Sequence, residues 1–216
     1  LGVDHQLPGQ VVGTVDVLYN RALHQLYLTD ANLLPPALVA SGEGGRPLYG
    51  TFTANGVSRP ARRDTLFGQV VRVTNWNGDN ALSVSLQLRK RFGDRAEASG
   101  FYAYTRARDR MSLVNPQARN NLANTSLGGT MDDRPLAPSY FEIPHRAQLS
   151  ASMRLPYQTS LSLLYTGAAG TPYTYIVVGD ANGDGVGTVA GQQSDIVYVP
   201  RDSLDITLTN PIDWKA

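Results

Sequence analysis

The residues from Ala81 to Thr105 alternate in polarity and predict two antiparallel β-strands joined by a tight turn. Successive side chains of a strand point to opposite faces, so each strand has one apolar and one polar face. The apolar face of the first strand carries Leu82, Val84, Leu86 and Leu88, and its polar face carries Ser83, Ser85, Gln87, Arg89 and Arg91. Phe92-Gly93-Asp94-Arg95 supplies the turn. Each strand is about as long as one that spans a bilayer, roughly 9–11 residues.

The same alternation recurs elsewhere in the chain. Arg146 to Leu155 alternates most cleanly, Thr159 to Thr166 returns from it, and Gln10 to Asn20 has the same pattern with two exceptions. Asn75 to Asp79 interrupts the segment that leads into Ala81, as a bulge or a small hairpin would. We therefore expect strands near 10–20, 66–92, 95–105, 146–155 and 159–178, and long loops over 21–65, 106–145 and 179–216.

Short and long connections alternate along the chain. Leu7–Gly9, Gly93–Asp94 and Pro156–Gln158 are short, whereas the three loop regions are long and rich in Gly, Pro and Asn. Long structureless loops are uncommon in compact soluble domains, but transmembrane β-barrels have short turns on one side and long loops on the other. The sequence therefore predicts an all-β fold over residues 1–216, namely an antiparallel transmembrane β-barrel segment with short turns on one side and long loops on the other.

Composition is consistent with this prediction. Charged residues are 17% of the chain, below the usual quarter, and the net charge of +1 gives no electrostatic case for nucleic-acid binding. There are no cysteines, and no apolar run approaches the length of a transmembrane helix. The chain starts at Leu1 rather than at a methionine, so we expect it to be a piece of a longer or processed protein.

The aromatic residues are spaced as two membrane-interface belts would be. Phe92 and Tyr157 lie at the short turns, and Tyr19, Tyr102, Tyr104 and Tyr165 lie toward the far ends of the expected strands. The alternative is that tyrosine is simply a favourable strand residue.

Several segments resemble one family of barrels. The stretches from Ala81 to Phe92 and from Ser99 to Asp109 resemble barrel strands of TonB-dependent outer-membrane receptors, and the nearest subgroup is the Oar-like one. Leu1-Gly2-Val3 with Leu7-Pro8-Gly9 and Val17–Arg21 is similar to an earlier strand pair of that family. Pro144-His145-Arg146 is similar to the start of the following strand, and 179–185 with 195–200 to the loop after it.

This resemblance implies a function and a location. The family has a barrel of about 22 strands, an N-terminal plug, and a periplasmic segment pulled by TonB; neither the plug nor that segment is recognisable here. By resemblance, this antiparallel transmembrane β-barrel segment is therefore expected to be part of a larger barrel. By resemblance, the protein is expected to lie in the bacterial outer membrane and to take up an unidentified extracellular ligand with energy delivered through TonB. Its expected partners are outer-membrane lipid, the TonB complex through the plug, and that ligand, but not nucleic acid.

One motif has the spacing of a metal site. Asp180-x-Asn182-x-Asp184-Gly185 matches the first half of a calcium-binding loop, with oxygen ligands at alternate positions. Gly191 stands where the closing glutamate is expected, although Asp195 could supply a carboxylate from further away. The alternative is an Asp/Asn/Gly-rich turn that holds no ion. Calcium is the one cofactor that the sequence suggests.

No catalytic constellation is apparent, so the protein is expected not to be an enzyme. His5, His24 and His145 lack ligand spacing, and Asp132-Asp133 is expected to be a solvated turn. The main alternative function is a soluble or surface-attached β-rich binding module, with calcium as a stabilising ion. The two hypotheses differ over Leu82, Leu86, Leu149 and Leu161, which contact lipid in a barrel and form a core in a soluble fold.

Overall fold

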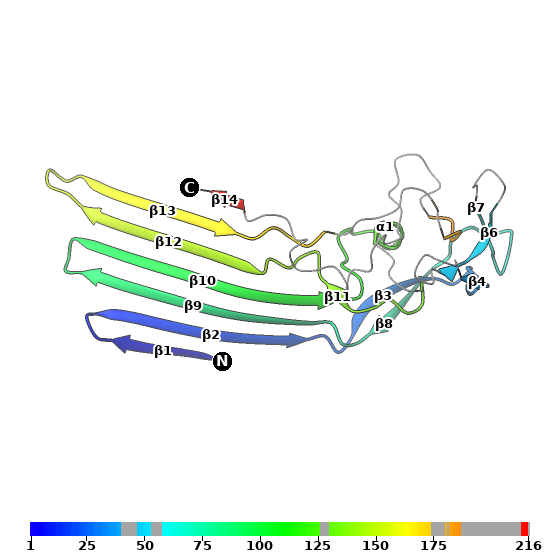
Figure 1. Ribbon diagram of the computed structural model, residues 1–216, viewed down its shortest axis with the longest axis horizontal. Helices are drawn as coiled ribbons and strands as arrows, with labels where there is room; N and C mark the ends of the chain where they lie inside the picture. Colours follow the sequence, from blue (N-terminus) through cyan, green and yellow to red (C-terminus); the bar gives the residue numbers. More distant parts are fainter. Residues whose placement is uncertain are drawn as a thin grey trace.

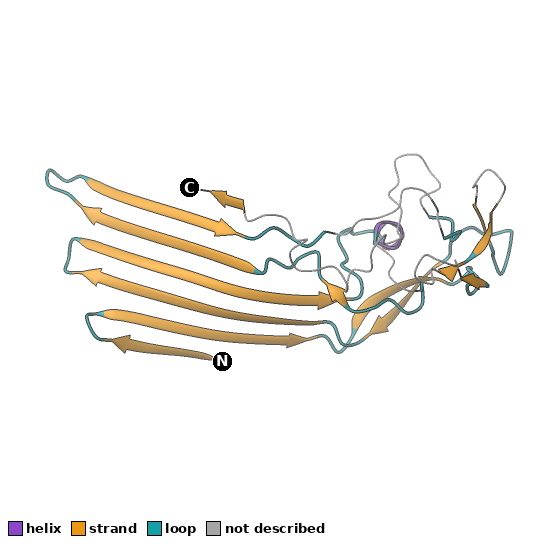
Figure 2. Ribbon diagram, in the orientation of Figure 1, coloured by secondary structure: helices purple, strands orange, loops and turns teal. Residues whose placement is uncertain are grey.

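The computed structural model describes residues 1–39, 47–52, 58–125, 130–173, 180, 182–186 and 213–215. A long, gently curved antiparallel sheet makes up one part of the molecule, and an assembly of loops and short strands lies at one end of it (Figures 1 and 2). Among the described residues, no helix combines the length and apolar character needed to cross a bilayer.

The large sheet has the strand order β1-β2-β9-β10-β12-β13-β14, with β11 paired to the end of β10. All its pairings are antiparallel, and the predicted antiparallel all-β fold is confirmed. The strands are β1 (Gly2–Leu7), β2 (Val11–Arg21), β9 (Asn80–Phe92), β10 (Ala96–Asp109), β11 (Ala137–Pro138), β12 (His145–Arg154), β13 (Ser160–Ala168) and β14 (Asp213–Lys215).

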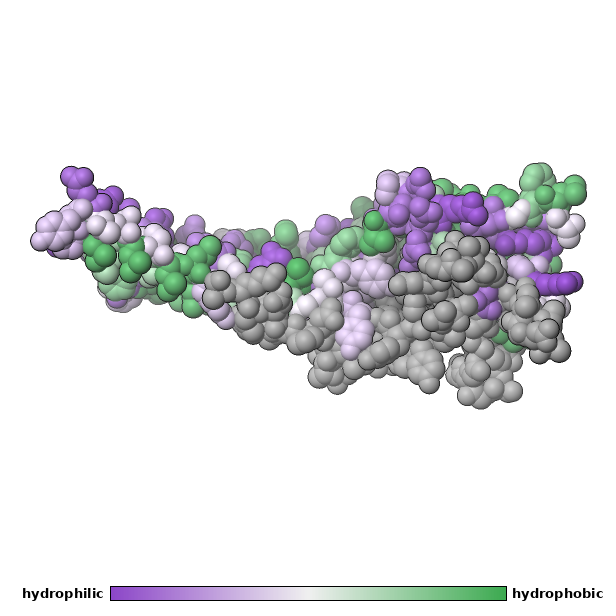
Figure 3. Space-filling model, turned by 90° about the horizontal axis from the view of Figure 1, so that it is seen from above, coloured by the Kyte–Doolittle hydropathy of each residue, from purple (hydrophilic) through white to green (hydrophobic). Residues whose placement is uncertain are grey.

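The register runs without a break from β2 to β13 and assembles two continuous faces. Leu86 pairs with Val15 on one side and Tyr102 on the other, and Tyr102 pairs with Ala147. One residue along, Gln87 pairs with Thr14 and Phe101, and Phe101 pairs with Gln148. Because the faces alternate, we call the face of Leu86 the apolar face and that of Gln87 the polar face. Figure 3 views the sheet nearly edge-on and shows hydrophobic side chains mostly on one side and hydrophilic ones on the other.

Three tight turns lie together at the end of the sheet away from the loops (Figure 1). Gly9 and Gln10 have φ of 78° and 60°, Gly93 has 61°, and Tyr157 and Gln158 have 61° and 58°. These left-handed conformations reverse the chain within very few residues, and Gly adopts them without steric cost. The predicted asymmetry of short turns at one end and long loops at the other is therefore present.

The strand expected over 66–92 begins later than expected, and it is interrupted within the stretch 75–79 where the sequence predicts an interruption. β8 (Val71–Trp76) starts five residues after the expected position, and Asn77–Asp79 separates it from β9. Bonds from a side chain distant in sequence explain the late start, because the Asn32 amide donates to the backbone oxygens of Asp64, Phe67 and Gly68. Side chains of this kind compete with strand pairing for the backbone. Leu66 to Val70 is consequently a turn and coil segment.

Two other expected boundaries also differ. β10 continues to Asp109, four residues beyond the expected end at 105, because Arg106 to Arg108 still pair with β9. β13 ends at Ala168 rather than at 178. Residues 174–178 of the strand expected over 159–178 lie outside the described residues, as does most of the loop expected over 179–216.

The regions expected to be long loops form the loop assembly, which has a core of its own. β3 (Gln25–Asp30) follows β2 in the chain and pairs with β8, which precedes β9. The β3–β8 pair therefore continues from the β2–β9 pair into the loop assembly. Small pairs follow, β4 (Leu38–Val39) with β5 (Pro47–Leu48) and β6 (Gly50–Phe52) with β7 (Ser58–Pro60), and then the short helix α1 (Ala118–Asn124). The buried cluster is Leu28, Leu33, Tyr49, Met111, Leu122 and Met131.

Candidate functional site

The apolar face of the sheet is not covered by other described parts of the chain. Leu86 and Leu88 are each 42% exposed, and Leu149 and Leu161 are 56% and 58% exposed. The hydrophobic core lies among the loops and contains none of these residues. A stripe of leucine, valine and tyrosine this large requires an apolar surrounding such as lipid, because soluble monomers rarely expose such patches. The exposure of Leu86, Leu149 and Leu161 therefore matches the lipid contact expected in a barrel and not the core expected in a soluble fold.

Aromatic residues border the apolar face near the loops. The Tyr102 hydroxyl and His145 Nδ1 are 2.8 Å apart, and the Tyr104 ring centroid lies 5.5 Å from that of His145. Near the turns, Lys90 Nζ lies 5.0 Å from the centre of the Phe92 ring. Amphipathic rings and a lysine at the two ends of an apolar band are typical of the levels at which a bilayer meets water.

The polar face carries charged residues near the turns and hydroxyls and amides further along. Glu97 accepts from Arg89 Nε and NH2 at 2.7 and 3.0 Å, and from Arg91 Nε at 3.3 Å. Beside them lies an open hollow of about 570 Å³ whose charged lining includes Arg95 and Arg154. Further along, the hydroxyls of Ser99 and Ser150 are 2.7 Å apart. Charged groups of this kind are stable facing water or another polar protein element.

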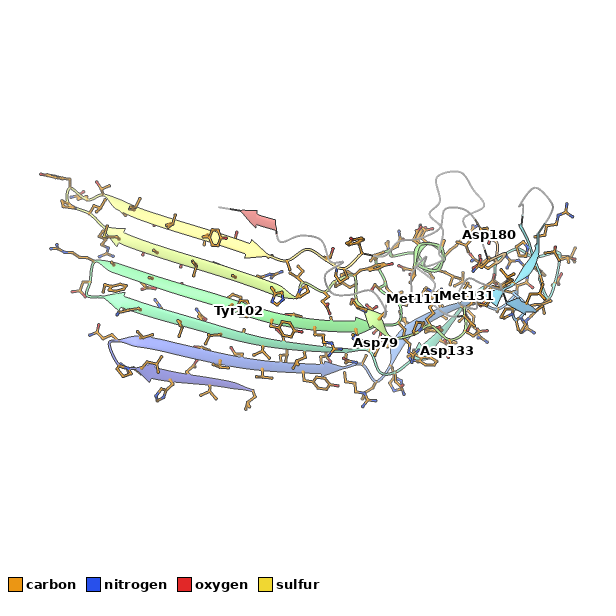
Figure 4. All side chains as sticks on the ribbon, in the orientation of Figure 1. Asp79, Tyr102, Met111, Met131, Asp133 and Asp180 are labelled. Carbon is orange, nitrogen blue, oxygen red and sulfur yellow. The ribbon has the colours of Figure 1, made fainter. Side chains whose placement is uncertain are left out.

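Two tyrosine hydroxyls connect the first and the second of the three long loop regions. The Tyr49 hydroxyl accepts from the Met131 N–H at 2.7 Å. The Tyr27 hydroxyl accepts from the Arg134 N–H at 3.1 Å and donates to the Met131 carbonyl at 3.3 Å. Met111 and Met131 lie close together in this assembly (Figure 4). Both tyrosines are 3% exposed, and these bonds hold Tyr27 and Tyr49 against residues 131–134.

A buried ion pair stabilises the first loop region. Arg62 NH1 binds Asp30 Oδ2, and Oδ1 of the same carboxylate accepts from the Asn32 and Val70 N–H groups at 3.0 Å each. The Asp30 side chain is 1% exposed and that of Arg62 is 14% exposed. Both oxygens of this carboxylate are therefore satisfied, which a group so fully removed from water requires.

Burial changes the ionisation of three groups in and around the loop assembly. Burial raises the pKa of the Tyr49 hydroxyl to about 12, although its bond from Met131 opposes this. Burial also raises the pKa of Glu142, against the opposing effects of the Ala107 N–H, Arg108 and Arg106. The pKa of Asp79 is raised by burial and by the nearby Asp109. These groups are structural, since they bind backbone N–H groups and lie in no shared cavity that the structure describes.

The three residues predicted to bind calcium lie together in a tight turn. Asp180 Oδ1 accepts from the N–H groups of Gly183 and Asp184, and its Oδ2 accepts from Gly185. Asn182 Nδ2 donates to Asp184 Oδ2 at 3.1 Å, and Asp184 Oδ1 accepts from Val186. Asn182 and Asp184 are each 1% exposed.

The described residues alone do not complete a metal centre. No group of three or more His, Cys, Asp or Glu that could hold an ion occurs among them, and residues 191 and 195 lie outside them. The bonds within the turn match the alternative of a turn without an ion, and calcium binding stays a prediction. The turn is anchored to the loops, because Tyr49 N–H donates to the Asn182 carbonyl at 2.8 Å and Arg62 donates to the Asp184 carbonyl at 3.3 Å.

The remaining sequence candidates are dispersed. His5 lies on β1, His24 between β2 and β3, and His145 at the start of β12. Asp132 and Asp133 are exposed and form surface pairs with Arg72 and Arg110. The sequence analysis did not identify Tyr27, Tyr49 or Arg134 as important. Arg134 is 1% exposed, and no local pattern predicts the burial of a loop arginine.

The comparison with known proteins agrees with this geometry. Residues 1–192 match the model of the family described as outer membrane beta barrel domain. No curated protein and no solved structure matches the chain. The sheet with one apolar and one polar face, the short turns at one end and the family match lead to the same conclusion. The chain belongs to the outer membrane beta barrel domain family, and it is a protein of the bacterial outer membrane.

Proposed function

We propose that this chain forms part of the barrel of a TonB-dependent active-transport receptor of the Oar-like subgroup, which takes up an extracellular ligand. The outer-membrane family membership limits the function to those performed by such barrels. The step to active transport rests on the resemblance of the strand segments, such as 81–92 and 99–109, to that family.

The observation that carries the proposal is the charged, water-accessible polar face. Small eight-stranded barrels fill their interior with side chains, whereas large barrels enclose a channel or a plug. Here the Arg89–Glu97–Arg91 group faces the interior and stays partly exposed, and β1 does not pair with β13 or β14 among the described residues. A wide lumen that contains a polar plug would solvate these charges and complete their hydrogen bonds.

The loop assembly suits the capture of a ligand outside the cell. Extracellular loops of barrels are longer than the periplasmic turns. The loop assembly of this chain has a buried core, and hydrogen bonds such as that between Tyr49 and Met131 join its segments. A preorganised binding surface loses less conformational entropy when it binds. In the proposed cycle the loops bind the ligand, TonB moves the plug, and the ligand passes along the polar face.

The soluble-module alternative has no support in the exposed apolar face or in the family match. We also propose that the protein is not an enzyme, since the described titratable groups form no nucleophile–base constellation. Calcium, if bound, would be a stabilising ion for the loops.

Conductance of the full-length protein in planar lipid bilayers tests the proposal. A plugged receptor should be nearly silent at moderate voltage and should conduct when urea loosens the plug. Surface plasmon resonance against the periplasmic domain of TonB should show saturable binding. A steady ohmic current without urea, together with no binding to TonB, would assign the chain to a passive porin instead.

A further inference from the structure

The apolar face ends near the loops in three arginines that follow directly on the aromatic border. Arg106 lies opposite Leu82, which lies opposite Tyr19. In the next row of the apolar face, Arg108 and Arg21 flank Asn80 from either side. Because the register is continuous, all three arginines share the face of Leu86 and Tyr102, the side that contacts lipid.

The height of these arginines corresponds to the headgroup level. Arg106 and Arg108 follow Tyr104 by two and four residues along β10. At about 3.3 Å per residue and a tilt of about 40°, they lie roughly 5 and 10 Å further out than Tyr104. Aromatic rings mark the interface itself, so these guanidinium groups extend into the polar layer of the outer leaflet.

The positive charge of this group is largely uncompensated. Arg21, Arg106 and Arg108 form no ion pair within the part of the chain that the structure describes. Glu142 interacts electrostatically with Arg106 and Arg108, but it is 5% exposed and its carboxylate accepts from the Ala107 N–H. One carboxylate therefore offsets only part of three positive charges.

We propose that Arg21, Arg106 and Arg108 form a binding surface for the phosphate groups of phosphorylated lipids in the outer leaflet. Guanidinium groups bind phosphate oxygens in a two-point geometry. The ring of Tyr104, one row nearer the middle of the sheet than Arg106, and the ring of Tyr19, in the same row as Arg106, would contact the acyl chains and glycerol or sugar groups of the same lipid. This inference depends on the outer-membrane location and not on transport, so it stands whether or not TonB is involved.

The chain offers a matched control on the opposite face. Arg146 lies opposite Ala103 in the register, at nearly the height of Tyr104, but it belongs to the polar face. It is exposed and forms no ion pair among the described residues. Arg146→Gln therefore removes the same charge at a similar height without touching the proposed surface.

The experiment measures lipid binding by the full-length protein in neutral detergent micelles with native mass spectrometry. The probes are diphosphoryl lipid A and the same lipid without its phosphates. The wild type should bind the phosphorylated probe at least tenfold more tightly. The pair Arg106→Gln with Arg108→Gln should lose about fivefold in affinity per guanidinium removed, and 0.5 M salt should weaken wild-type binding because it screens the charges. Arg146→Gln should stay within about twofold of the wild type.

Each alternative outcome contradicts the proposal. Equal affinity for both probes would show that the phosphates are not recognised, and an equal loss in Arg146→Gln would show a nonspecific charge effect. Displacement of the lipid by inorganic phosphate at equal concentration would assign the surface to free phosphate. Folded barrels are identified by their heat-modifiable migration in gels. If the double variant does not fold, Arg21→Gln alone should bind the phosphorylated probe about fivefold more weakly than the wild type.

Discussion

Leu149 on β12 leans over Gly100 on β10, its register partner, so that a Cβ added at Gly100 would lie 3.3 Å from Leu149 Cδ2. The leucine fills the space above the glycine and still remains 56% exposed. It lies near the middle of the apolar face, between Met153 close to the turns and His145 close to the loops. We therefore use it to test which face of the sheet contacts lipid.

Leu149→Arg should destabilise folding into bilayers by about 2–4 kcal/mol, because it places a charge near the hydrocarbon midplane. The control is Gln148→Arg, one residue away on the polar face, which should change the folding free energy by less than about 1 kcal/mol. Urea titration of the full-length protein in lipid vesicles measures both values. Equal effects of the two substitutions would contradict the assignment of the faces.

Asp30→Ala should loosen the first loop region strongly. It leaves Arg62 buried without its carboxylate and removes the acceptor of the Asn32 and Val70 N–H groups, and breaking such a pair costs about 3–5 kcal/mol. Hydrogen exchange should accelerate at residues 30–34 and 62–72 but not in β9 or β10. Asp132→Ala, which breaks the exposed pair with Arg72 and leaves the bond between Asp30 and Arg62 in place, should cost at most about 1 kcal/mol. Similar hydrogen exchange in both variants would show that the buried ion pair stabilises the first loop region no more than the exposed pair does.

Gly50→Ala should separate the turn at 182–186 from the strand pair β6–β7. A Cβ at Gly50 would lie 2.2 Å from the Arg59 carbonyl oxygen and 2.8 Å from that of Gly183, so the backbone on both sides of Gly50 would have to shift. Limited proteolysis should show faster cleavage in the loop assembly. Gly68→Ala, where a Cβ would meet nothing within 4 Å, should be cleaved like the wild type. Protection in Gly50→Ala equal to the wild type would refute the close approach.

Glu142 should make the contact between residues 139–142 and β10 sensitive to pH. Its pKa is raised from 4.5 by burial, so the folded state holds the proton more strongly than the unfolded state. The stabilisation is therefore fully present below pH 4.5 and is lost as the pH rises through the folded pKa. Exchange of the Ala107 amide, corrected for its intrinsic pH dependence, should accelerate over this range in the wild type. Glu142→Gln should show no such step, and a step that persists in this variant would assign the effect to Asp79 instead.

Calcium binding to the turn at Asp180 can be tested by calorimetry. If the ion binds, titration of the full-length protein should release or absorb heat, and Asp184→Ala should abolish that heat. The affinity should be modest, in the range of about 10⁻⁴–10⁻³ M, because no closing glutamate follows at the twelfth position. An absence of heat in the wild type would leave the turn as a purely hydrogen-bonded structure.

The sheet could be predicted from the sequence because its signals are local. Alternation of the kind seen at 82–88 fixes which residues share a face, and Gly93 with Asp94 fixes where the chain reverses. The loop assembly could not be predicted, because its organisation rests on contacts between residues about a hundred positions apart, such as Tyr27 with Arg134. The late start of β8 has the same origin, since Asn32 binds carbonyls more than thirty residues away.

The hydroxyl bonds from Tyr27 and Tyr49 to residues 131–134 also restrict how this family can be engineered. A chimera that receives only one of the two loops from a relative would leave a buried hydroxyl or a peptide N–H without its counterpart, at a cost of about 1–3 kcal/mol for each group. The two loops should therefore be grafted together, as a single cassette.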